Sequence, residues 1–396
     1  MDTARRPVAM FIALRGYALV KSRALIMEHL RRGGWQVVIV TEDDEHSREL
    51  VRQGAVLYPV SFGHRPDNPG DEVAAMRGVF RAMNKHKPDL LHCFGAKPMI
   101  YGGWAARMHR RTRAVCTVTG LGSAFEAGGR IQKLSKWGFK TSLPRFKRVI
   151  FQNRDDMGMF LDNGWVRPDQ ALLIVGSGVD VDLFKPVPPP VSERHVVLLT
   201  ARLLWAKGVR EYVDAVEMIS VDYPEIEFQL AGEVIEGRPD AVDQAYIDEV
   251  HRRGNVKFLG YLRNFPEVLG SARMFVAPSY YREGVPRVLL EASSAGVPVI
   301  TADSPGCREA VVDGVTGLLV PPRKVEPLAQ AMRKLLDDGA LCDRLGQQAR
   351  EHALAEFDLR AITAKQVQVY IESGAPLEPY PSGLEATAPT GPAAVS

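Results

Sequence analysis

Cysteine is scarce in this sequence and long apolar runs are absent. The 396 residues include four cysteines, and no two of them form a C-x-x-C pair. This favours buried thiols in a reducing compartment over disulfides or a metal site. No stretch approaches the roughly 20 apolar residues that span a bilayer. The apolar run at residues 8–14 is too short for a signal peptide and has no small-residue cleavage site after it. We therefore expect a cytoplasmic protein.

Two nucleotide-binding fingerprints are also missing. The run at residues 8–14 is followed by Arg15-Gly16-Tyr17-Ala18 and not by G-x-G-x-x-G, which argues against a nicotinamide-dependent oxidoreductase. The absence of G-x-x-x-x-G-K-[ST] removes the usual phosphate-binding loop of an ATPase. No histidine recurs at ligand spacing with a cysteine or carboxylate, so we expect no metal site. The formal net charge of +3 is too small to identify a partner.

Short apolar strands alternate with amphipathic helical stretches along most of the chain. Hydrophobic content of 46% and charged content of 24% are typical of globular proteins. The alternation predicts parallel sheets covered by helices on both faces. The expected strands are residues 8–14, 37–41, 90–94, 114–119, 148–152 and 172–175, followed by 195–200, 227–231, 256–259, 274–276, 297–301 and 317–320.

The segment Pro186–Ser192 interrupts this alternation. Its three consecutive prolines neither continue a helix nor pair in a central strand, so it is expected to be a linker. We predict an α/β fold with two doubly wound Rossmann-like domains, residues 1–188 and 189–355, facing each other across a ligand cleft. Residues 356–375 are expected to form a helix that packs back on the first domain. Residues 376–396 are rich in Pro, Gly, Ala, Ser and Thr and are expected to be disordered.

Two basic residues follow the first strand of the second domain. Arg202 and Lys207 lie beyond the carboxyl end of strand 195–200, where a parallel sheet places its ligands. Two cations there suit a diphosphate, and Gly208 before a helix adds backbone N–H donors. The spacing alone leaves open that both are solvated surface charges.

Two glutamates lie eight positions apart around a turn. Glu283 precedes Gly284-Val285-Pro286, and Glu291 follows in the expected helix. Carboxylates accept hydrogen bonds from neighbouring hydroxyls, so this pair suits a sugar ring and a ribose. The amides of Gly284 and Val285 at a helix N-terminus suit a phosphate. Taken alone, the two glutamates are equally consistent with surface charges.

These residues and two further segments, Ala295–Val299 (AGVPV) and Asp313–Val320 (DGVTGLLV), together resemble a family 4 retaining glycosyltransferase with the GT-B fold. The resemblance implies that Arg202 and Lys207 neutralise the diphosphate of a nucleotide sugar as it leaves. It implies that Glu291 accepts hydrogen bonds from the ribose and that Glu283 holds the donor sugar.

The same resemblance assigns further donor-binding positions. The backbone at Gly284, Val285 and Pro286 would orient sugar and phosphate, the segment Gly260-Tyr261-Leu262 would read the base, and Gly16 would belong to the same site. No metal is implied, because the two cations supply the charge that Mg²⁺ supplies elsewhere. The only co-substrate implied is the nucleotide sugar, taken to be a UDP-sugar, with no cofactor.

Motifs of the first domain are similar to one subgroup of this family, which transfers sugars, often N-acetylhexosamine, onto undecaprenyl-diphosphate-linked sugars of O-antigen, capsule or protein-linked glycans. The similar segments are residues 65–69, 87–92, 97–102, 119–125, 151–156 and 176–180. The resemblance assigns the acceptor to Asn68, His92, Lys97, Thr119 and Gly120. Many members have a donor-contacting histidine where this chain has Thr119. A structural role for His92 remains an alternative.

The stretch 130–148 is basic and contains apolar side chains. It has no acidic residue, and Ile131, Leu134, Trp137 and Phe139 alternate with lysines and arginines. This composition suits an anionic membrane surface, and a plain solvated face is the alternative. No recognition motif favours nucleic acid. The basic members are Arg130, Lys133, Lys136, Lys140, Arg145, Lys147 and Arg148, with Arg107, His109, Arg110, Arg111 and Arg113 expected on the same side.

The sequence therefore predicts a hexosyltransferase or N-acetylhexosaminyltransferase, peripheral on the inner face of the cell membrane, acting in surface polysaccharide or glycan synthesis. Three alternatives stay open: a GT-B sugar-nucleotide 2-epimerase, a glycosyltransferase with a soluble acceptor, and a non-catalytic sugar-nucleotide or lipid-binding protein. The donor sugar, the linkage and the oligomeric state do not follow from the residues.

Overall fold

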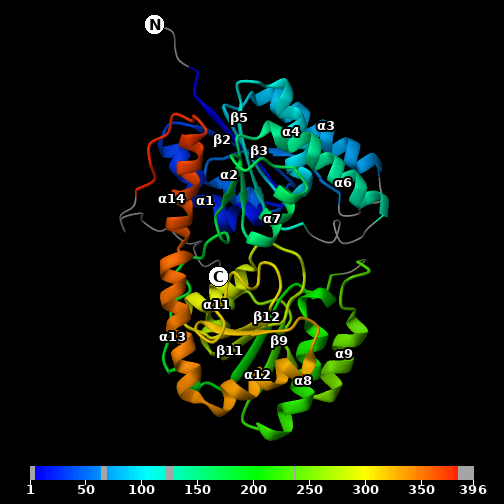
Figure 1. The fold of residues 1–396 in the computed structure, drawn as a ribbon, viewed down its shortest axis with the longest axis vertical. Helices are drawn as coiled ribbons and strands as arrows, with labels where there is room; N and C mark the ends of the chain where they lie inside the picture. Colours follow the sequence, from blue (N-terminus) through cyan, green and yellow to red (C-terminus); the bar gives the residue numbers. More distant parts are fainter. Residues whose placement is uncertain (1–4, 64–68, 122–128, 236–237, 382–396) are drawn as a thin grey trace. The chain divides into compact units, whose positions relative to one another are not determined.

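The computed structural model describes residues 5–63, 69–121, 129–235 and 238–381 (Figure 1). By contacts between Cα positions the chain divides into two compact units. The first consists of Met1–Thr117, Gly138–Val149 and Leu359–Ser396, and the second of Val118–Trp137 and Ile150–Asp358.

A seven-stranded sheet with the order β3-β2-β1-β4-β5-β6-β7 is formed by the first half of the chain. The residues of β1 and β4 are fully buried, which is why both read as continuous apolar runs. Figure 1 shows α1, α2 and α14 on one side of this sheet and α3, α4 and α6 on the other. The strands are β1 Val8–Ile12, β2 Gln36–Thr41, β3 Val56–Pro59, β4 Leu90–Phe94, β5 Arg113–Val118, β6 Arg148–Phe151 and β7 Ala171–Leu173. The helices are α1 Gly16–Arg32, α2 Glu45–Arg52, α3 Pro69–His86, α4 Ala96–Met108, α6 Gly129–Ser142, α7 Arg154–Asp162 and α14 Leu359–Glu372, with the 3-10 turn η1 Leu143–Arg145.

A six-stranded sheet with the order β10-β9-β8-β11-β12-β13 forms the core of the second unit. The chain moves outward from β8 to β10 and then returns to β11 beside β8. This reversal is the topological switch point, where open parallel sheets bind ligands at the carboxyl ends of their strands. The strands are β8 Val196–Thr200, β9 Glu227–Ala231, β10 Lys257–Phe258, β11 Ala272–Ala277, β12 Val299–Ala302 and β13 Gly317–Val320. The helices are α8 Val209–Ile219, α9 Gln244–Arg253, α10 Phe265–Gly270, α11 Arg287–Ser294, α12 Val325–Asp337 and α13 Gly339–Glu356, with 3-10 turns η2 Val191–Glu193, η3 Trp205–Lys207 and η4 Ser220–Asp222.

The predicted fold class, two Rossmann-like domains with parallel sheets, is confirmed. Each expected strand is present with its ends displaced by at most two residues. The strand that the sequence does not predict is β3, whose residues are half-buried or exposed and form no apolar run. The proline segment lies between β7 and β8, so it separates the two sheets as expected.

The compact units differ from the predicted ranges 1–188 and 189–355. The segments that follow β5 and β6 contact loops of the second sheet and therefore belong to the second unit. The helix expected at residues 356–375 corresponds to α14, which belongs to the first unit and contacts α1.

The predicted disordered tail, residues 376–396, includes residues that pack against α1. Glu378 and Tyr380 both contact His29 of α1. The carbonyl of Glu378 is 2.9 Å from His29 Nε2, and the ring centroids of His29 and Tyr380 are 5.3 Å apart. Residues 382–396 lie outside the described part of the chain.

Candidate functional site

The two loops at the switch point of the second sheet bring together the residues that the sequence predicts for a diphosphate site. Lys207, in η3 after β8, forms an ion pair with the carboxylate of Glu283, in the loop after β11. Lys207 is buried and the side chain of Glu283 is about one-fifth exposed. Arg202, in the same loop as Lys207, is exposed. The structure therefore places the expected catalytic residues Arg202, Lys207 and Glu283 at one edge of one sheet.

Close packing of backbone fixes the two loops against each other. Gly208 has a φ of +79°, and a Cβ there would lie 2.5 Å from the carbonyl oxygen of Pro278. The N–H of Tyr280 donates to the carbonyl of Ala206 at 2.9 Å. The residue after η3 must be a glycine, because any other residue would adopt this positive φ at a cost and its Cβ would clash with the carbonyl of Pro278. Gly208 thus sets the distance between the lysine loop and the glutamate loop.

The turn at Glu283 and Gly284 lies in a narrow backbone niche. A Cβ on Gly120 would lie 2.4 Å from the Cα of Glu283, and one on Gly306 would lie 2.0 Å from the carbonyl oxygen of Gly284. A Cβ on Gly284 itself would lie 2.0 Å from Gln152 Oε1. Gly120 and Gly306 therefore permit this turn, because a larger residue at either position would press on its backbone. A larger residue at Gly284 would meet the end of the Gln152 side chain, which can move.

Hydrogen bonds from residues of the first-domain motifs hold the same turn. The N–H of Gly284 donates to the carbonyl of Thr119 at 3.0 Å. Asn153 Nδ2 donates to the carbonyls of Gly284 and Glu283 at 3.2 and 3.4 Å. The Gly284 amide is thus already occupied, contrary to its expected role as a phosphate donor. Thr119 and Gly120, assigned to the acceptor from the resemblance, contact the turn that carries Glu283.

Glu291 is held by an ion pair within its own helix. Arg287 Nη2 donates to Glu291 Oε1 at 3.0 Å, and Glu291 is 7% exposed. Nε and Nη1 of Arg287 are buried and make no hydrogen bond among the described residues. The i, i+4 spacing on α11 is the sequence signal that indicates this pair. Arg287 therefore fixes the rotamer of the carboxylate expected to hold the ribose.

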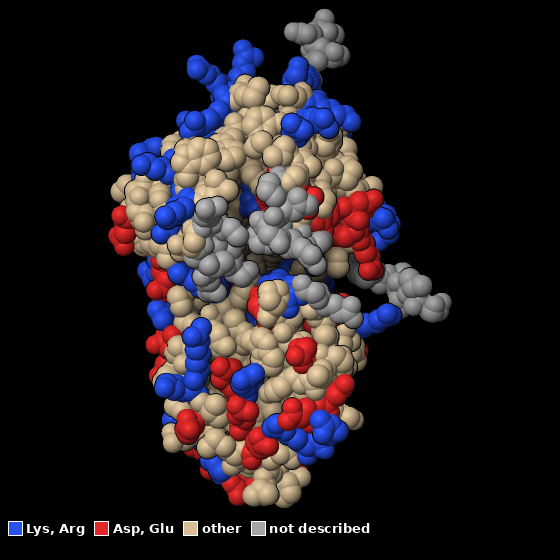
Figure 2. All heavy atoms as spheres, turned by 90° about the vertical axis from the view of Figure 1, so that its right-hand side faces the viewer, with Lys and Arg blue, Asp and Glu red and all other residues tan. Residues whose placement is uncertain are grey.

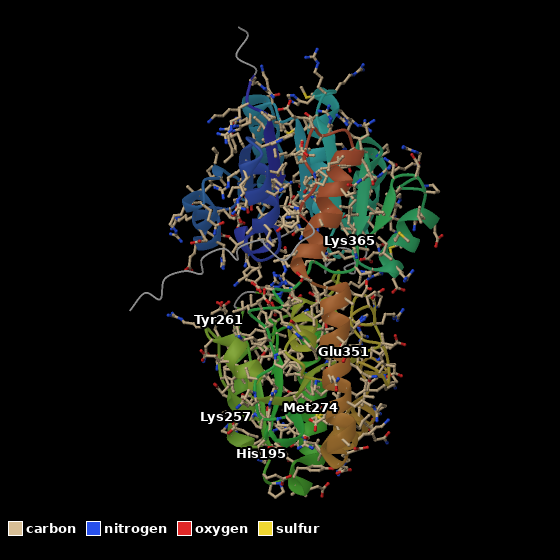
Figure 3. The ribbon with its side chains drawn as sticks, turned by 90° about the vertical axis from the view of Figure 1, so that its left-hand side faces the viewer. His195, Lys257, Tyr261, Met274, Glu351 and Lys365 are labelled. Carbon is tan, nitrogen blue, oxygen red and sulfur yellow. The ribbon has the colours of Figure 1, made fainter. Side chains whose placement is uncertain are left out.

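The segment expected to read the base ends β10 at the same edge of the second sheet. The carbonyl of Gly260 accepts from the N–H of Gly232, after β9, at 2.9 Å. Tyr261 is 68% exposed. In Figure 3, His195 just before β8 and Tyr261 just after β10 mark the amino and carboxyl ends of the sheet. Gly260-Tyr261-Leu262 therefore lies at the carboxyl edge, as Arg202 and Lys207 do.

Gly16 has a structural role that the sequence does not reveal. Its N–H donates to Asp44 Oδ2 at 2.9 Å, and a Cβ on it would lie 2.4 Å from both Asp44 Oδ1 and the amide nitrogen of Ser47. Asp44 caps α2, so Gly16 allows the start of α1 to approach the start of α2. Its amide is occupied by Asp44, and its expected role in donor binding stays a prediction.

His92 is a buried structural histidine. Its ring is 0% exposed, Nδ1 is 2.5 Å from the hydroxyl of Tyr370, and Nε2 is 2.8 Å from Thr117 Oγ1. Burial, and then the nearby Arg23, lowers the pKa of His92 well below its ordinary value. Its assignment to the acceptor is therefore wrong in this conformation, because neither ring nitrogen faces a ligand. The alternative stated for this residue is the one the structure supports.

Lys97 is also engaged inside the first unit. Its ammonium donates to the carbonyls of Phe62 and Gly63 at 2.8 and 3.3 Å and to the carboxylate of Glu72. The hydroxyl of Tyr101 donates to the same carboxylate. An ammonium has three N–H groups, and all three have partners here. Lys97 is not placed to bind an acceptor in this conformation, and Asn68 lies outside the described residues.

The cysteines are free and buried, as the sequence predicts. Burial raises the pKa of each thiol, most strongly for Cys93 and Cys116, so all four are poor nucleophiles. Within the part of the chain that is described, no three His, Cys, Asp or Glu side chains gather as a metal site would need. No helix in the same part is both long and apolar enough to cross a bilayer.

Two protein-family models match this chain. The model "Glycosyl transferases group 1" matches residues 167–352, and the model "Glycosyl transferase 4-like domain" matches residues 21–178. Together they cover residues 21–352, which include every strand of both sheets except β1.

Two curated relatives are similar along most of their length. One is the N,N'-diacetylbacillosaminyl-diphospho-undecaprenol alpha-1,3-N-acetylgalactosaminyltransferase of Campylobacter jejuni, 24% identical over 91% of this chain and 97% of the relative. Another is the UDP-Gal:alpha-D-GlcNAc-diphosphoundecaprenol alpha-1,3-galactosyltransferase of Escherichia coli, 23% identical over 76% of this chain and 80% of the relative.

Solved structures share the fold. The sucrose-phosphate synthase of Thermosynechococcus elongatus superposes with a TM-score of 0.75 at 23% identity, covering 93% of this chain and 99% of its own. HepE of Anabaena, in complex with UDP-glucose, superposes with a TM-score of 0.73 at 20% identity, covering 92% and 99%.

Proposed function

We propose that this chain, a GT-B glycosyltransferase of family 4 type, transfers a hexose or N-acetylhexosamine from a UDP-sugar to a lipid-diphosphate-linked sugar. The chain has a group 1 domain and a 4-like domain. The ion pair of Lys207 with Glu283, beside the exposed Arg202 at the switch point, carries this proposal. Two cations suit a diphosphate and a neighbouring carboxylate suits sugar hydroxyls, and this supports the proposal.

The acceptor class is proposed from the relatives. Both the Campylobacter jejuni and the Escherichia coli proteins are named for sugars linked to undecaprenol through a diphosphate, and both are similar over most of this chain. The donor class is supported by the Escherichia coli relative, named for UDP-Gal, and by the fold shared with the UDP-glucose complex of HepE.

The proposed reaction retains the anomeric configuration. The acceptor hydroxyl attacks the anomeric carbon from the face that the diphosphate leaves. The bond between acceptor oxygen and anomeric carbon forms while the bond from that carbon to the phosphate oxygen breaks, and a phosphate oxygen takes the hydroxyl proton. Lys207 and Arg202 stabilise the charge that develops on the leaving diphosphate. The proposed reaction therefore requires neither a protein nucleophile nor a metal ion.

A donor screen tests this function. The purified protein is incubated with UDP-glucose, UDP-galactose and their N-acetylated forms, together with a synthetic polyprenyl-diphosphate sugar, and products are identified by mass spectrometry. We expect one donor to add its sugar to the acceptor. An isomeric nucleotide sugar formed without acceptor would instead show an epimerase. The absence of any donor consumption would overturn the proposal.

Variants connect the activity to the site. Lys207→Met and Glu283→Gln are each expected to lower turnover about 10²–10³-fold, as the loss of one preorganised charge does in other enzymes. The matched control is Lys257→Met. Lys257, labelled in Figure 3, pairs with Glu227 on the surface at 3.1 Å, and its loss should leave turnover unchanged. Near-normal activity of both site variants would contradict the assignment.

We also propose that α6 contacts an anionic membrane surface. Leu134 and Trp137 are 65% and 54% exposed on this helix, and Lys133 and Lys140 are exposed beside them. Exposed apolar side chains among lysines are the composition of helices that lie in the lipid interface. Phe139, also expected on this surface, is 1% exposed and faces the protein interior instead.

The end of α4, in the first unit, carries a second group of exposed apolar and basic side chains. Met108 is 65% exposed, and Arg107, Arg110 and Arg111 around it are exposed. Arg145 does not belong to the surface, because it donates to the carbonyls of Ala106, His109 and Thr112 at 2.8–2.9 Å and so fastens the turn after α4. Figure 2 shows Lys and Arg side chains gathered at the upper end of the face that it draws.

Vesicle flotation tests the membrane proposal. We expect binding to vesicles that contain phosphatidylglycerol and little binding to phosphatidylcholine alone. The double variant Leu134→Ala and Trp137→Ala should reduce binding, because it removes the apolar contacts. The matched control is Met218→Ala, on α8, whose side chain is 49% exposed in the second unit. Equal binding of the wild type to both vesicles would exclude the electrostatic part.

A further inference from the structure

The ring of Tyr281 lies beside both cations of the candidate donor site. The guanidinium carbon of Arg202 is 5.4 Å from the ring centroid, and Lys207 Nζ is 5.3 Å from it. Both distances lie within the range in which a cation is attracted to an aromatic face. Tyr281 also belongs to the Glu283 loop, since its carbonyl accepts from the N–H of Glu283 at 2.9 Å. One side chain therefore touches both charges of the site.

A third cation lies close to the same tyrosine. Arg238, after β9, forms a two-bond pair with Asp240, with nitrogen–oxygen distances of 2.8 and 2.6 Å. This carboxylate, and more weakly the hydroxyl of Tyr281, raises the pKa of Arg238. The carbonyl of Asp240 accepts from the N–H of Trp205 at 3.1 Å, which ties this loop to η3. Tyr281 thus joins three loops at the carboxyl edge of the sheet.

The three cations differ in whether a carboxylate pairs with them, which decides how much positive charge is left for a ligand. Lys207 is opposed by Glu283, and Arg238 is opposed by Asp240. Arg202 forms no ion pair with a carboxylate among the described residues. A carboxylate in the position of Tyr281 would hold Arg202 and Lys207 together but would cancel the charge that attracts an anion. An aromatic face attracts cations through its quadrupole and leaves their net charge intact.

We propose that Tyr281 is a positioning residue for the donor diphosphate, which holds Arg202 and Lys207 against its ring while their charge stays available to the ligand. This inference rests on the proposed use of a nucleotide-sugar donor. It also extends it, because the family resemblance assigns no role to this tyrosine. The effect of the ring should appear in the binding of the diphosphate and not in the binding of the nucleoside.

Calorimetric titration with UDP and with uridine tests this separation. Tyr281→Leu removes the aromatic face and keeps an apolar side chain. We expect it to weaken UDP binding about tenfold, the size of two cation–π contacts, and to leave uridine binding unchanged. Tyr281→Phe keeps the face and should bind UDP within about twofold of the wild type. Tyr281→Met is the second variant without a ring, should the leucine variant fail to fold.

Tyr280 provides a matched control on the neighbouring position. Its ring lies 4.4 Å from the guanidinium carbon of Arg323, a cation outside the site. Tyr280→Leu removes one cation–π contact of the same kind and should leave the ratio of UDP to uridine affinity unchanged. If the ratio of UDP to uridine affinity changed equally in Tyr280→Leu and Tyr281→Leu, the effect would not be specific to Arg202 and Lys207.

The outcomes separate this inference from the proposed function. Equal loss of UDP and uridine affinity in Tyr281→Leu would show a merely structural tyrosine and overturn the inference. Unchanged UDP affinity in both ring-less variants would overturn it too. If UDP binds and responds to the ring while no acceptor is ever glycosylated, the inference stands and the proposed transfer falls. A wild type that binds no UDP would overturn both.

Discussion

Gly306 and Gly284 approach each other so closely that a single methyl group would separate them. A Cβ on Gly306, whose φ is +86°, would lie 2.0 Å from the carbonyl oxygen of Gly284. The same carbonyl accepts from Asn153, and the preceding residue is Glu283. The position of a functional carboxylate is therefore set by a contact between two backbones, more than twenty positions apart in sequence.

This contact predicts that Gly306→Ala lowers activity. The new methyl group must push the Gly284 turn away, and Glu283 moves with it. We expect turnover to fall at least tenfold and the free energy of unfolding to fall by about 2–4 kcal/mol, from a clash added to an unfavourable φ. Transfer assays and urea denaturation measure both effects.

Gly314→Ala is the matched control for this change. Gly314 also has a positive φ, +70°, but a Cβ there meets nothing within 4 Å. Only the conformational cost of about 1 kcal/mol should remain, with activity intact. If the two variants were equally active, Gly306 would not position the turn.

The sequence predicts the sheets well, because each central strand is buried on both faces and reads as an apolar run. It fails at β3, which is half-buried and gives no such signal. Strand ends and turns also predict where Lys207 and Glu283 emerge, and the two form an ion pair. That they share one donor site with Arg202 and Glu291 stays a prediction.

The contacts that hold the site do not follow from the sequence in the same way. Nothing local to Gly120 or Gly306 indicates that each lies against the Glu283 turn, because such proximity depends on tertiary packing. The sequence also gives no sign that His92, Lys97 and Gly16 are engaged inside the protein. Each follows a motif or a strand in the expected way, yet its polar atoms bond to Tyr370, Glu72 or Asp44 instead of facing a ligand.

Arg287 offers a second prediction, on nucleotide recognition. Its guanidinium holds Glu291 at 3.0 Å, so loss of the charge should release the carboxylate expected to bind the ribose. Arg287→Met should weaken UDP about tenfold, the loss of one charge-assisted hydrogen bond, and should weaken 2′-deoxy-UDP less. Competitive titration of both nucleotides measures the difference.

The control for this variant is Arg253→Met. Arg253 also forms an i, i+4 pair, with Glu249 on α9, in the reverse order along the helix. It pairs with Glu217 as well, and both pairs are exposed. Its loss should leave both affinities unchanged. A loss of UDP and 2′-deoxy-UDP affinity by the same factor in Arg287→Met would show that Arg287 does not act through the ribose.

His92 gives a prediction on stability and pH. Burial lowers its pKa in the folded state, so the folded protein binds fewer protons at this site than the unfolded chain does once the pH falls below about 6.5. Stability therefore decreases as the pH falls through that value, by up to about 1.4 kcal/mol per pH unit from this residue. At pH 8 the residue is neutral in both states and contributes no pH dependence.

Urea denaturation of the wild type and of His92→Gln, at pH 8, 6.5 and 5.5, isolates this effect from the carboxylates, which titrate in both proteins. Glutamine keeps a hydrogen-bonding side chain toward Tyr370 and Thr117 but has no proton to gain. We expect the variant to be less stable at pH 8, because its bonds to these partners are poorer, and to lose less stability than the wild type between pH 6.5 and 5.5. Parallel pH profiles for the two proteins would mean that His92 keeps its ordinary pKa, and its placement between Tyr370 and Thr117 would then not describe the folded state.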